Sequence, residues 1–401
     1  MTEDRRTARN NPFTPGYGAV PEVFAGRRAE FAEFDDVLLP RLRDGVYEQA
    51  RLVTGDRGVG KTVFLLHLEQ DAREAGDWPV RVSARPGEGV VADLLQRLAE
   101  ALDAHHLARR LSARSLDALR LLAGIRVGPE GIGIEVARPS GATIDRGAEL
   151  SRLLVEAGRL AAERGAVLLV LVDEAQNIAA PALADLCHAL QEAQSTATLE
   201  TAPNGARVRR HLPIGVYVAG LPGVVGQLQQ AGATFFERSR HLDFGLLGDA
   251  DVREGLVAFA ANRDVAIDAP ALDRLVELVQ GYPYFLHLIG HRVWTAGTGP
   301  VITVEEVDEG YAIARADLDG FYAERLRGLG DLQHDWLRAA AAVDDADRTT
   351  GAVAARLGRR SSQLGSTVRA LVDRGLIRMA PGRGRFEFGL PGLAGHLRAD
   401  R

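Results

Sequence analysis

The chain has 401 residues, 46% of them hydrophobic and 25% charged, which is ordinary for a soluble globular protein of two or three domains. Its one cysteine, Cys187, excludes an intrachain disulfide, and no apolar run approaches the roughly 18 residues that span a bilayer. The net charge of −6 argues against nucleic-acid binding over the whole surface. We expect a soluble, cytoplasmic protein with no membrane partner.

The charge is unevenly distributed along the chain. Residues 351–401 contain ten arginines and three carboxylates, so this segment carries +7. Because the whole chain carries −6, the other 350 residues carry −13. A basic end on an acidic body predicts a tail or domain with its own polyanionic partner.

Strand-like apolar runs alternate with helical spacing over the first 250 residues, which predicts a parallel α/β sheet built from right-handed crossovers. We also expect a β-hairpin insertion at 125–136 and a loop at 201–211. The expected strands are 50–54, 80–82, 166–172 and 214–219, and the expected helices are 31–42, 61–75, 89–104, 146–164 and 181–194.

The pattern from 249 to 329 is helical throughout and predicts a small helical lid domain. We therefore expect a sheet domain at 1–248, the lid at 249–329 and a third domain at 330–401. The expected lid helices are 249–262, 269–279, 283–297 and 304–327.

The only lysine of the chain, Lys61, lies in Gly55-Asp56-Arg57-Gly58-Val59-Gly60-Lys61-Thr62, which Val63 follows. This G-x-x-x-x-G-K-T pattern is a P-loop, and it stands between a strand and a helix as the motif requires. Arginine can supply the positive charge at most sites, but it cannot replace the compact, flexible ammonium that lies over a phosphate chain. The only lysine of the chain stands where such an ammonium is needed. We expect residues 55–63 to bind ATP, with Lys61 on the β- and γ-phosphates and Thr62 on Mg²⁺.

Asp173 and Glu174 follow the apolar run 166–172, which fits a strand buried on both faces. Asp173 can hold Mg²⁺ through water, and Glu174 can polarise the attacking water as a general base. Two adjacent carboxylates at this place have little structural use. Glu174 thus makes the nucleotide binder a candidate hydrolase.

Two further segments are candidate parts of the site. Arg238 follows the fourth strand and its helix, where an arginine can reach a neighbouring subunit's γ-phosphate; a surface pair with Glu237 is the alternative. Gly281-Tyr282-Pro283 opens a lid helix, so Pro283 can lie over the nucleotide; a plain proline at a helix start is the alternative.

These motifs resemble those of the AAA+ P-loop ATPases, in particular the origin-recognition/Cdc6-like branch and its prokaryotic relatives. The lead-in residues 11–13 and 24–31 are similar to the segment that clasps adenine in that group. The resemblance covers nearly the whole chain. It implies an ATP- and Mg²⁺-dependent ATPase that forms a homo-oligomer when ATP is bound.

The chain also departs from that pattern. The strand 214–219 ends in Gly220-Leu221-Pro222, without Asn, Ser or Thr at the usual first-sensor position. Gly281-Tyr282-Pro283 stands where a second sensor would carry arginine, and this Gly-x-Pro is more similar to the STAND class of signalling ATPases. STAND-like proteins use nucleotide exchange as a slow switch, so fast turnover is not implied.

The third domain has the pattern of a winged helix: helices at 332–343, at 351–357 with Thr350 as cap, and at 361–374, then two short strands within 378–388. Winged helices also serve as protein-interaction or autoinhibitory modules, but the charge of +7 at this end favours duplex DNA. The expected DNA contacts are Arg360, Ser361, Gln363 and Thr367 on the third helix, and Arg383 and Arg385 on the wing.

Our first hypothesis is a DNA-binding ATPase whose nucleotide state controls DNA engagement and self-assembly. The alternative is a STAND-like switch whose winged helix regulates its own ATPase core or binds a protein partner. A third hypothesis is an assembly factor that needs only ATP binding.

Overall fold

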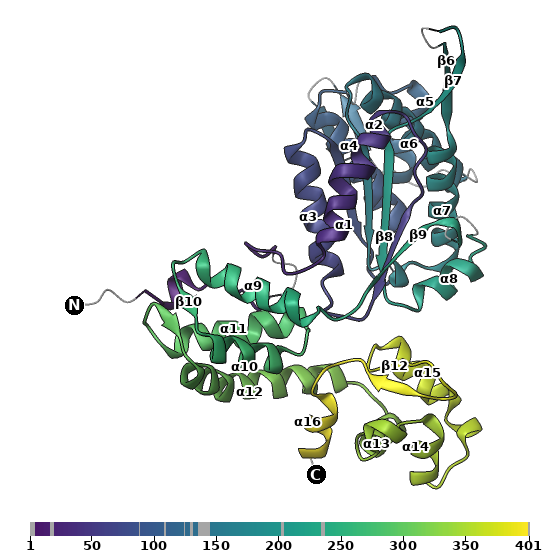
Figure 1. Cartoon of the computed structure of the whole chain (residues 1–401). Helices are drawn as coiled ribbons and strands as arrows, with labels where there is room; N and C mark the ends of the chain where they lie inside the picture. Colours follow the sequence, from purple (N-terminus) through teal and green to yellow (C-terminus); the bar gives the residue numbers. More distant parts are fainter. Residues whose placement is uncertain are drawn as a thin grey trace. The chain divides into compact units, whose positions relative to one another are not determined.

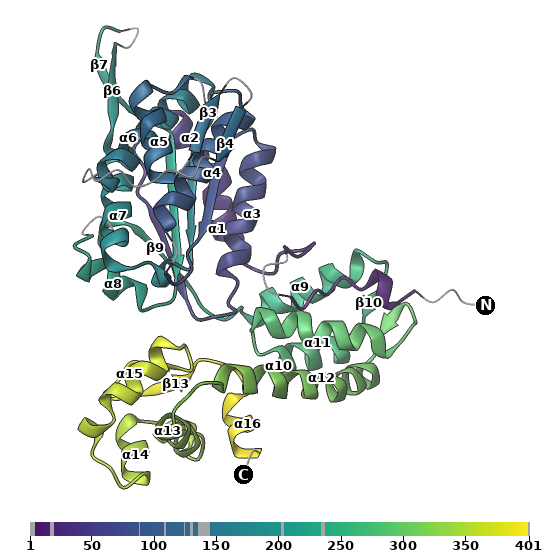
Figure 2. The ribbon, with the colours of Figure 1, turned by 180° about the vertical axis from the view of Figure 1, so that it is seen from behind.

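The computed structural model describes residues 5–16, 20–87, 89–107, 110–123, 125–128, 131–134, 145–201, 204–233 and 237–399, seen from opposite sides in Figures 1 and 2. The chain divides into two compact units. Unit 1 comprises residues 1–26, 56–60 and 245–401, and unit 2 comprises residues 27–55 and 61–244. The P-loop therefore has residues in both units.

Unit 2 is built on a five-stranded parallel sheet, as the sequence predicts. The two innermost predicted strands are fully buried apolar runs, which is typical of a sheet covered on both faces. The edge strand β9 is half exposed and was not predicted. The strand order is β2 (Trp78–Ser83), β5 (Leu168–Asp173), β8 (Ile214–Gly220), β1 (Arg51–Gly55) and β9 (Arg240–Phe244).

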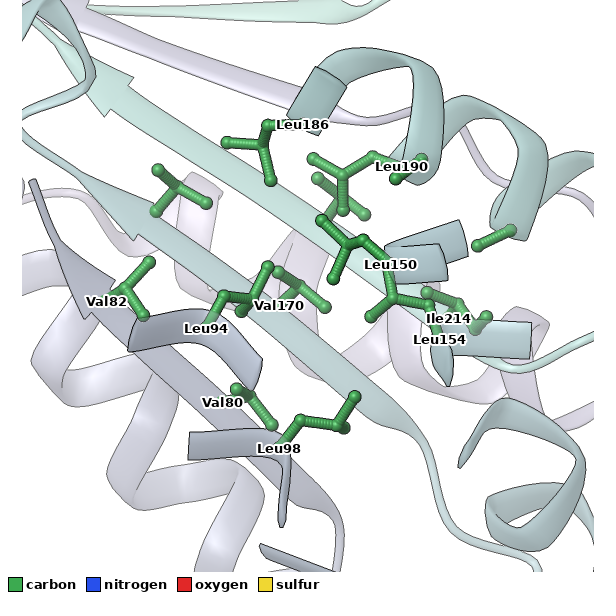
Figure 3. Packing of buried hydrophobic residues seen from close by; sticks show 14 of the residues in the cluster. Val80, Val82, Leu94, Leu98, Leu150, Leu154, Val170, Leu186, Leu190 and Ile214 are labelled. Carbon is green, nitrogen blue, oxygen red and sulfur yellow. The ribbon is translucent and has the colours of Figure 1, made fainter. Parts of the chain in front are cut away.

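Helices cover both faces of this sheet. On one face, leucines of α4, α6 and α7 pack on Val80, Val170 and Ile214 of the strands (Figure 3). On the other, Phe64 of α3 lies 5.0 Å from Phe244, ring centroid to centroid. The helices are α1 (Arg28–Glu33), a π-helix (Phe34–Leu38), α2 (Leu39–Arg43), α3 (Lys61–Glu74), α4 (Val90–Ala104), α5 (Ala113–Ala123), α6 (Arg146–Glu163), α7 (Ala180–Ser195) and α8 (Val224–Gln230).

Unit 2 also contains two antiparallel hairpins. The first, β3 (Ile125–Gly128) with β4 (Gly131–Ile134), lies within the insertion expected at 125–136; residues 129, 130, 135 and 136 lie outside the described residues. The second pairs β6 (Ala197–Thr201) with β7 (Arg207–His211). The prediction of a loop at 201–211 was therefore wrong, because both strands are largely exposed and lack the buried apolar face that signals a strand in the sequence.

A buried charge cluster lies at the start of β1. Arg51 is 2% exposed and donates to Glu33 of α1 at 2.6 Å and to Glu48 at 2.9 Å. Arg240 of β9 also pairs with Glu33 at 2.9 Å. Each buried charge thus has an opposite charge within hydrogen-bonding distance, which a buried ion requires.

Unit 1 contains the four helices predicted within residues 249–329. The amino-terminal segment packs on them: Phe13 is buried, with ring centroids 5.2 Å from Phe259 and 6.3 Å from Trp294. Two-residue strands β10 (Ala266–Ile267) and β11 (Val301–Ile302) pair beside these helices. The helices are α9 (Asp249–Ala261), α10 (Ala269–Val279), α11 (Pro283–Ala296) and α12 (Val304–Leu326).

Three helices and a two-stranded hairpin follow, as predicted for residues 330–401, and a fourth helix, α16, was not predicted. Thr349, rather than Thr350, accepts the capping hydrogen bond of α14, since Thr350 already has helical backbone. The elements are α13 (Asp331–Ala341), α14 (Thr350–Arg356), α15 (Gly365–Asp373), β12 (Ile377–Met379), β13 (Phe386–Phe388) and α16 (Leu393–Ala399). Across the described residues, every helix is too short or too polar to cross a membrane.

Candidate functional site: the P-loop and the acidic strand end

The P-loop leaves β1 at Gly55 and enters α3 at Lys61. Gly58 and Gly60 have φ values of +83° and +96°, a region that residues with a Cβ rarely occupy. Lys61 is 8% exposed, and its ammonium donates to the carbonyl oxygen of Gly55 at 2.7 Å. The loop therefore has the backbone turn and the single cation that a phosphate cradle needs.

The carboxyl end of β5 holds the acidic pair in the same unit as Lys61. Asp173 is 1% exposed, and its Oδ1 accepts the N–H of Glu174 at 2.9 Å. Burial raises the pKa of Asp173, and a hydrogen bond with the Thr62 side chain lowers it. Asp173 and Thr62 are thus neighbours, as expected for two residues that share one ion.

The residues fit a magnesium ion bound with a nucleotide. The Oδ2 of Asp173 is buried without a hydrogen-bond partner, and such an orphaned oxygen suits a hydrated cation. Within the described ranges, no three His, Cys, Asp or Glu side chains gather as metal ligands. A P-loop ion takes its remaining ligands from phosphate oxygens and water.

Gln176 is a site residue to which the sequence assigned no role. Its amide nitrogen donates to Oε2 of Glu174, and its Oε1 accepts the N–H of Leu221 at 3.0 Å. Leu221 directly follows β8, where the usual polar first sensor is missing. Glu174 has a left-handed φ of 54°, so its backbone and its carboxylate are both fixed. Gln176 therefore connects the candidate base to the end of β8.

The Gly-x-Pro segment contacts the P-loop residues that belong to unit 1. The hydroxyl of Tyr282 donates to the carbonyl of Arg57 at 2.7 Å, and a Cβ on Gly58 would lie 2.1 Å from that hydroxyl. Gly281 has φ +70°, and a Cβ there would meet the carbonyl of Leu247 at 2.4 Å. Both glycines are thus required by close approach, and Pro283 begins α11 directly after the contact.

Arg238 is exposed just before β9. The expected alternative, a pair with Glu237, is absent among the described residues, since neither side chain forms an ion pair there. The preceding Phe235 and Phe236 lie outside the described residues. The role of Arg238 across a subunit interface stays a prediction.

The basic carboxyl-terminal residues are mostly available to a partner. Arg360, Ser361, Gln363, Arg383 and Arg385 are exposed. Thr367 is 7% exposed, so its predicted contact with a groove was wrong: its position on α15 turns it toward the core beside Leu371 and Leu364. Arg360, Ser361 and Gln363 lie in and just before a 3-10 turn (Ser361–Gln363) that precedes α15, so they are not on the third helix as predicted. Their contacts with DNA stay predictions.

Comparisons with known proteins agree with this geometry. Residues 23–201 match the family model described as AAA ATPase domain, and residues 319–397 match one described as domain of unknown function (DUF8462). No curated protein matches the chain. The first match contains the P-loop, the acidic pair and the hairpin β3–β4.

Several solved structures are similar over nearly the whole chain, among them the following two. A Walker-type ATPase of Pyrococcus abyssi has a TM-score of 0.59 at 16% identity, covering 94% of this chain and 96% of that one. The ORC2 protein of Aeropyrum pernix, in ADPNP–ADP complexes, has a TM-score of 0.55 at 14% identity, covering 96% and 97%. These structures confirm the α/β P-loop fold, and the family model over residues 23–201 confirms the resemblance to AAA ATPases.

Proposed function

Because residues 23–201 form an AAA ATPase domain, we propose that this ATPase turns over slowly and uses its nucleotide state to control duplex DNA binding and self-assembly. The observation that carries the proposal is that the P-loop after β1 and the residues Asp173 and Glu174 after β5 lie at the carboxyl edge of one parallel sheet. Ligands of open α/β sheets bind at that edge.

Each residue at this edge has a proposed task. Residues 55–63 cradle the phosphates, and Lys61 neutralises charge on the β- and γ-phosphates. Mg²⁺, when bound with ATP, supplies charge neutralisation, and Thr62 and Asp173 are the residues that would hold it. Glu174 accepts a proton from the attacking water, and Gln176 sets how freely its carboxylate moves. Arg238 reaches the γ-phosphate of a second subunit.

Mutation of the lysine and of the base separates binding from hydrolysis. Lys61→Ala should abolish ATP binding in equilibrium dialysis, because the compact cation at the phosphates is lost. Glu174→Gln should bind ATP as wild type does and hydrolyse it slowly. A Glu174→Gln protein with wild-type hydrolysis would refute the assignment of the base.

DNA binding is proposed for the domain at 330–401, which we interpret as a winged helix. Support comes from the helices α13, α14 and α15 with the hairpin β12–β13, from the charge of +7 over residues 351–401, and from the exposed Arg360, Arg383 and Arg385. Replacing these three arginines with alanine should weaken binding to any duplex and reduce its salt dependence. Unchanged affinity would refute the assignment. We further propose that the protein acts in the cytoplasm.

A second candidate function, a nucleotide-exchange switch, is favoured by one contact inside unit 1. Arg378 of β12 lies 3.9 Å from the carboxylate of the P-loop residue Asp56, nitrogen to oxygen. Such a contact would let the carboxyl-terminal domain hold the phosphate loop in one state. Arg378→Ala should then speed release of bound ADP, and an unchanged release rate would exclude the switch.

A further inference from the structure

The ribbon β6–β7 is a separate two-stranded sheet that extends from the edge of unit 2 beyond α7 (Figures 1 and 2). It is anchored at its base only, as far as the described residues show. There the N–H of His211 donates to the carbonyl of Gly45 at 2.8 Å, and Arg210 donates to the carbonyl of Asp44 at 2.5 Å. The outer half of the ribbon thus stands away from the core on a fixed base.

The two faces of the ribbon differ in charge. Side chains along a strand point alternately to its two faces, so Arg207 and Arg209 lie on one face of the ribbon. Their cross-strand partners on that same face are Thr201 and Leu199 of β6. Both arginines are exposed, and neither pairs with a carboxylate of the described chain. On the other face, Arg210 pairs with Glu200 at 2.8 Å. One face therefore offers two cations to a partner.

The apolar residues of the ribbon bury too little surface to explain why these two strands form a hairpin. An isolated pair of strands is marginal in water unless a further layer covers it. Here Leu199 is 58% exposed and Val208 is 39% exposed, on opposite faces, so neither buries the apolar area that would stabilise the hairpin. Two separated apolar side chains also form no continuous patch of the kind that a protein interface buries.

We propose that the β6–β7 ribbon is a second DNA-contacting element, which enters a groove of duplex DNA with Arg207 and Arg209 on the phosphates. A two-stranded ribbon fits the major groove, which is about 12 Å wide. Guanidinium groups bind phosphate oxygens through two parallel hydrogen bonds. The net charge of the ribbon residues, three arginines against one glutamate, complements a polyanion.

The test is the salt dependence of binding to a 30-base-pair duplex of arbitrary sequence. Each phosphate contact contributes about 0.9 to the slope of log affinity against log salt, so Arg207→Ala/Arg209→Ala should reduce the slope by about 1.8. Arg207→Lys/Arg209→Lys should retain it. A matched control, Arg159→Ala/Arg164→Ala, removes two exposed charges from α6 and its carboxyl end and should leave the slope unchanged. An unchanged slope in the ribbon alanine variant overturns the proposal.

This inference rests on the proposed function in one respect, since both name duplex DNA as the ligand. The variants distinguish failure of the ribbon inference from failure of the carboxyl-terminal assignment. Suppose that the triple variant of Arg360, Arg383 and Arg385 binds the duplex as wild type does, while the alanine variant of the ribbon has a smaller salt slope. The ribbon inference then stands, and the carboxyl-terminal assignment is refuted. The reverse result overturns the ribbon inference alone. An unchanged slope with altered sedimentation of the DNA-free protein would assign the ribbon to a protein contact instead.

Discussion

Replacing Tyr282 with phenylalanine tests whether the Gly-x-Pro segment governs the phosphate loop. The change removes the hydroxyl that donates to the carbonyl of Arg57 at 2.7 Å and keeps the buried ring. A neutral hydrogen bond of this kind contributes about 1 kcal/mol net. That energy corresponds to about fivefold in an equilibrium constant. We expect the P-loop to open about five times more often and bound ADP to leave about fivefold faster.

The assay is stopped-flow release of a fluorescent ADP, with Tyr322→Phe as the matched control. Tyr322 donates an equivalent bond, to the carbonyl of Pro391 at 2.6 Å, and its acceptor is not a P-loop residue. Both variants should lose about 1 kcal/mol of unfolding free energy. Only Tyr282→Phe should release ADP faster. Equal release rates in the two variants would show that the Tyr282 contact stabilises the fold without controlling the nucleotide.

Two further predictions concern buried charge and protonation. Glu33→Ala should lower the urea unfolding free energy by about 3 kcal/mol, because Arg51 stays buried with less compensation; removing the exposed Glu100, which pairs with Arg97, should cost less than about 1 kcal/mol. Burial lowers the pKa of His287 from 6.5 to about 4, so the unfolded chain takes up the proton first as pH falls. The stability that the uncharged, buried His287 contributes to the fold is fully present above pH 6.5 and is lost as the pH falls from 6.5 to about 4. In His287→Gln, the melting temperature should therefore change less with pH over that range. An acid profile identical to wild type would contradict this.

The strongest sequence patterns predicted the centre of the fold. The buried runs of β5 and β8 left no alternative to a covered parallel sheet, and G-x-x-x-x-G-K-T fixed where the loop after β1 must be. Lys61 and Asp173 lie at the carboxyl edge of the sheet, where their motifs predicted them, and their roles in catalysis stay predictions. These features depend on local sequence, and the structure places them as expected.

The features that sequence did not predict depend on tertiary contacts or on weak local patterns. In the sequence, Gln176 is a polar residue with no recognisable role. Its contact with Leu221 forms only because the fold brings the end of β8 beside it. The ribbon β6–β7 has no buried face, so its strands lack the apolar alternation that predicts strands elsewhere. Thr367 was assigned to an exposed face from helical spacing, but its turn of α15 faces the core.

The central claim is that Glu174 activates water for hydrolysis of ATP held by the P-loop. It is tested most directly by single-turnover hydrolysis of radiolabelled ATP, with wild type and Glu174→Gln both saturated with nucleotide. We predict equal ATP affinity and a hydrolysis rate reduced at least about 100-fold, as the loss of a positioned general base implies. Equal rates for the two proteins would contradict the account.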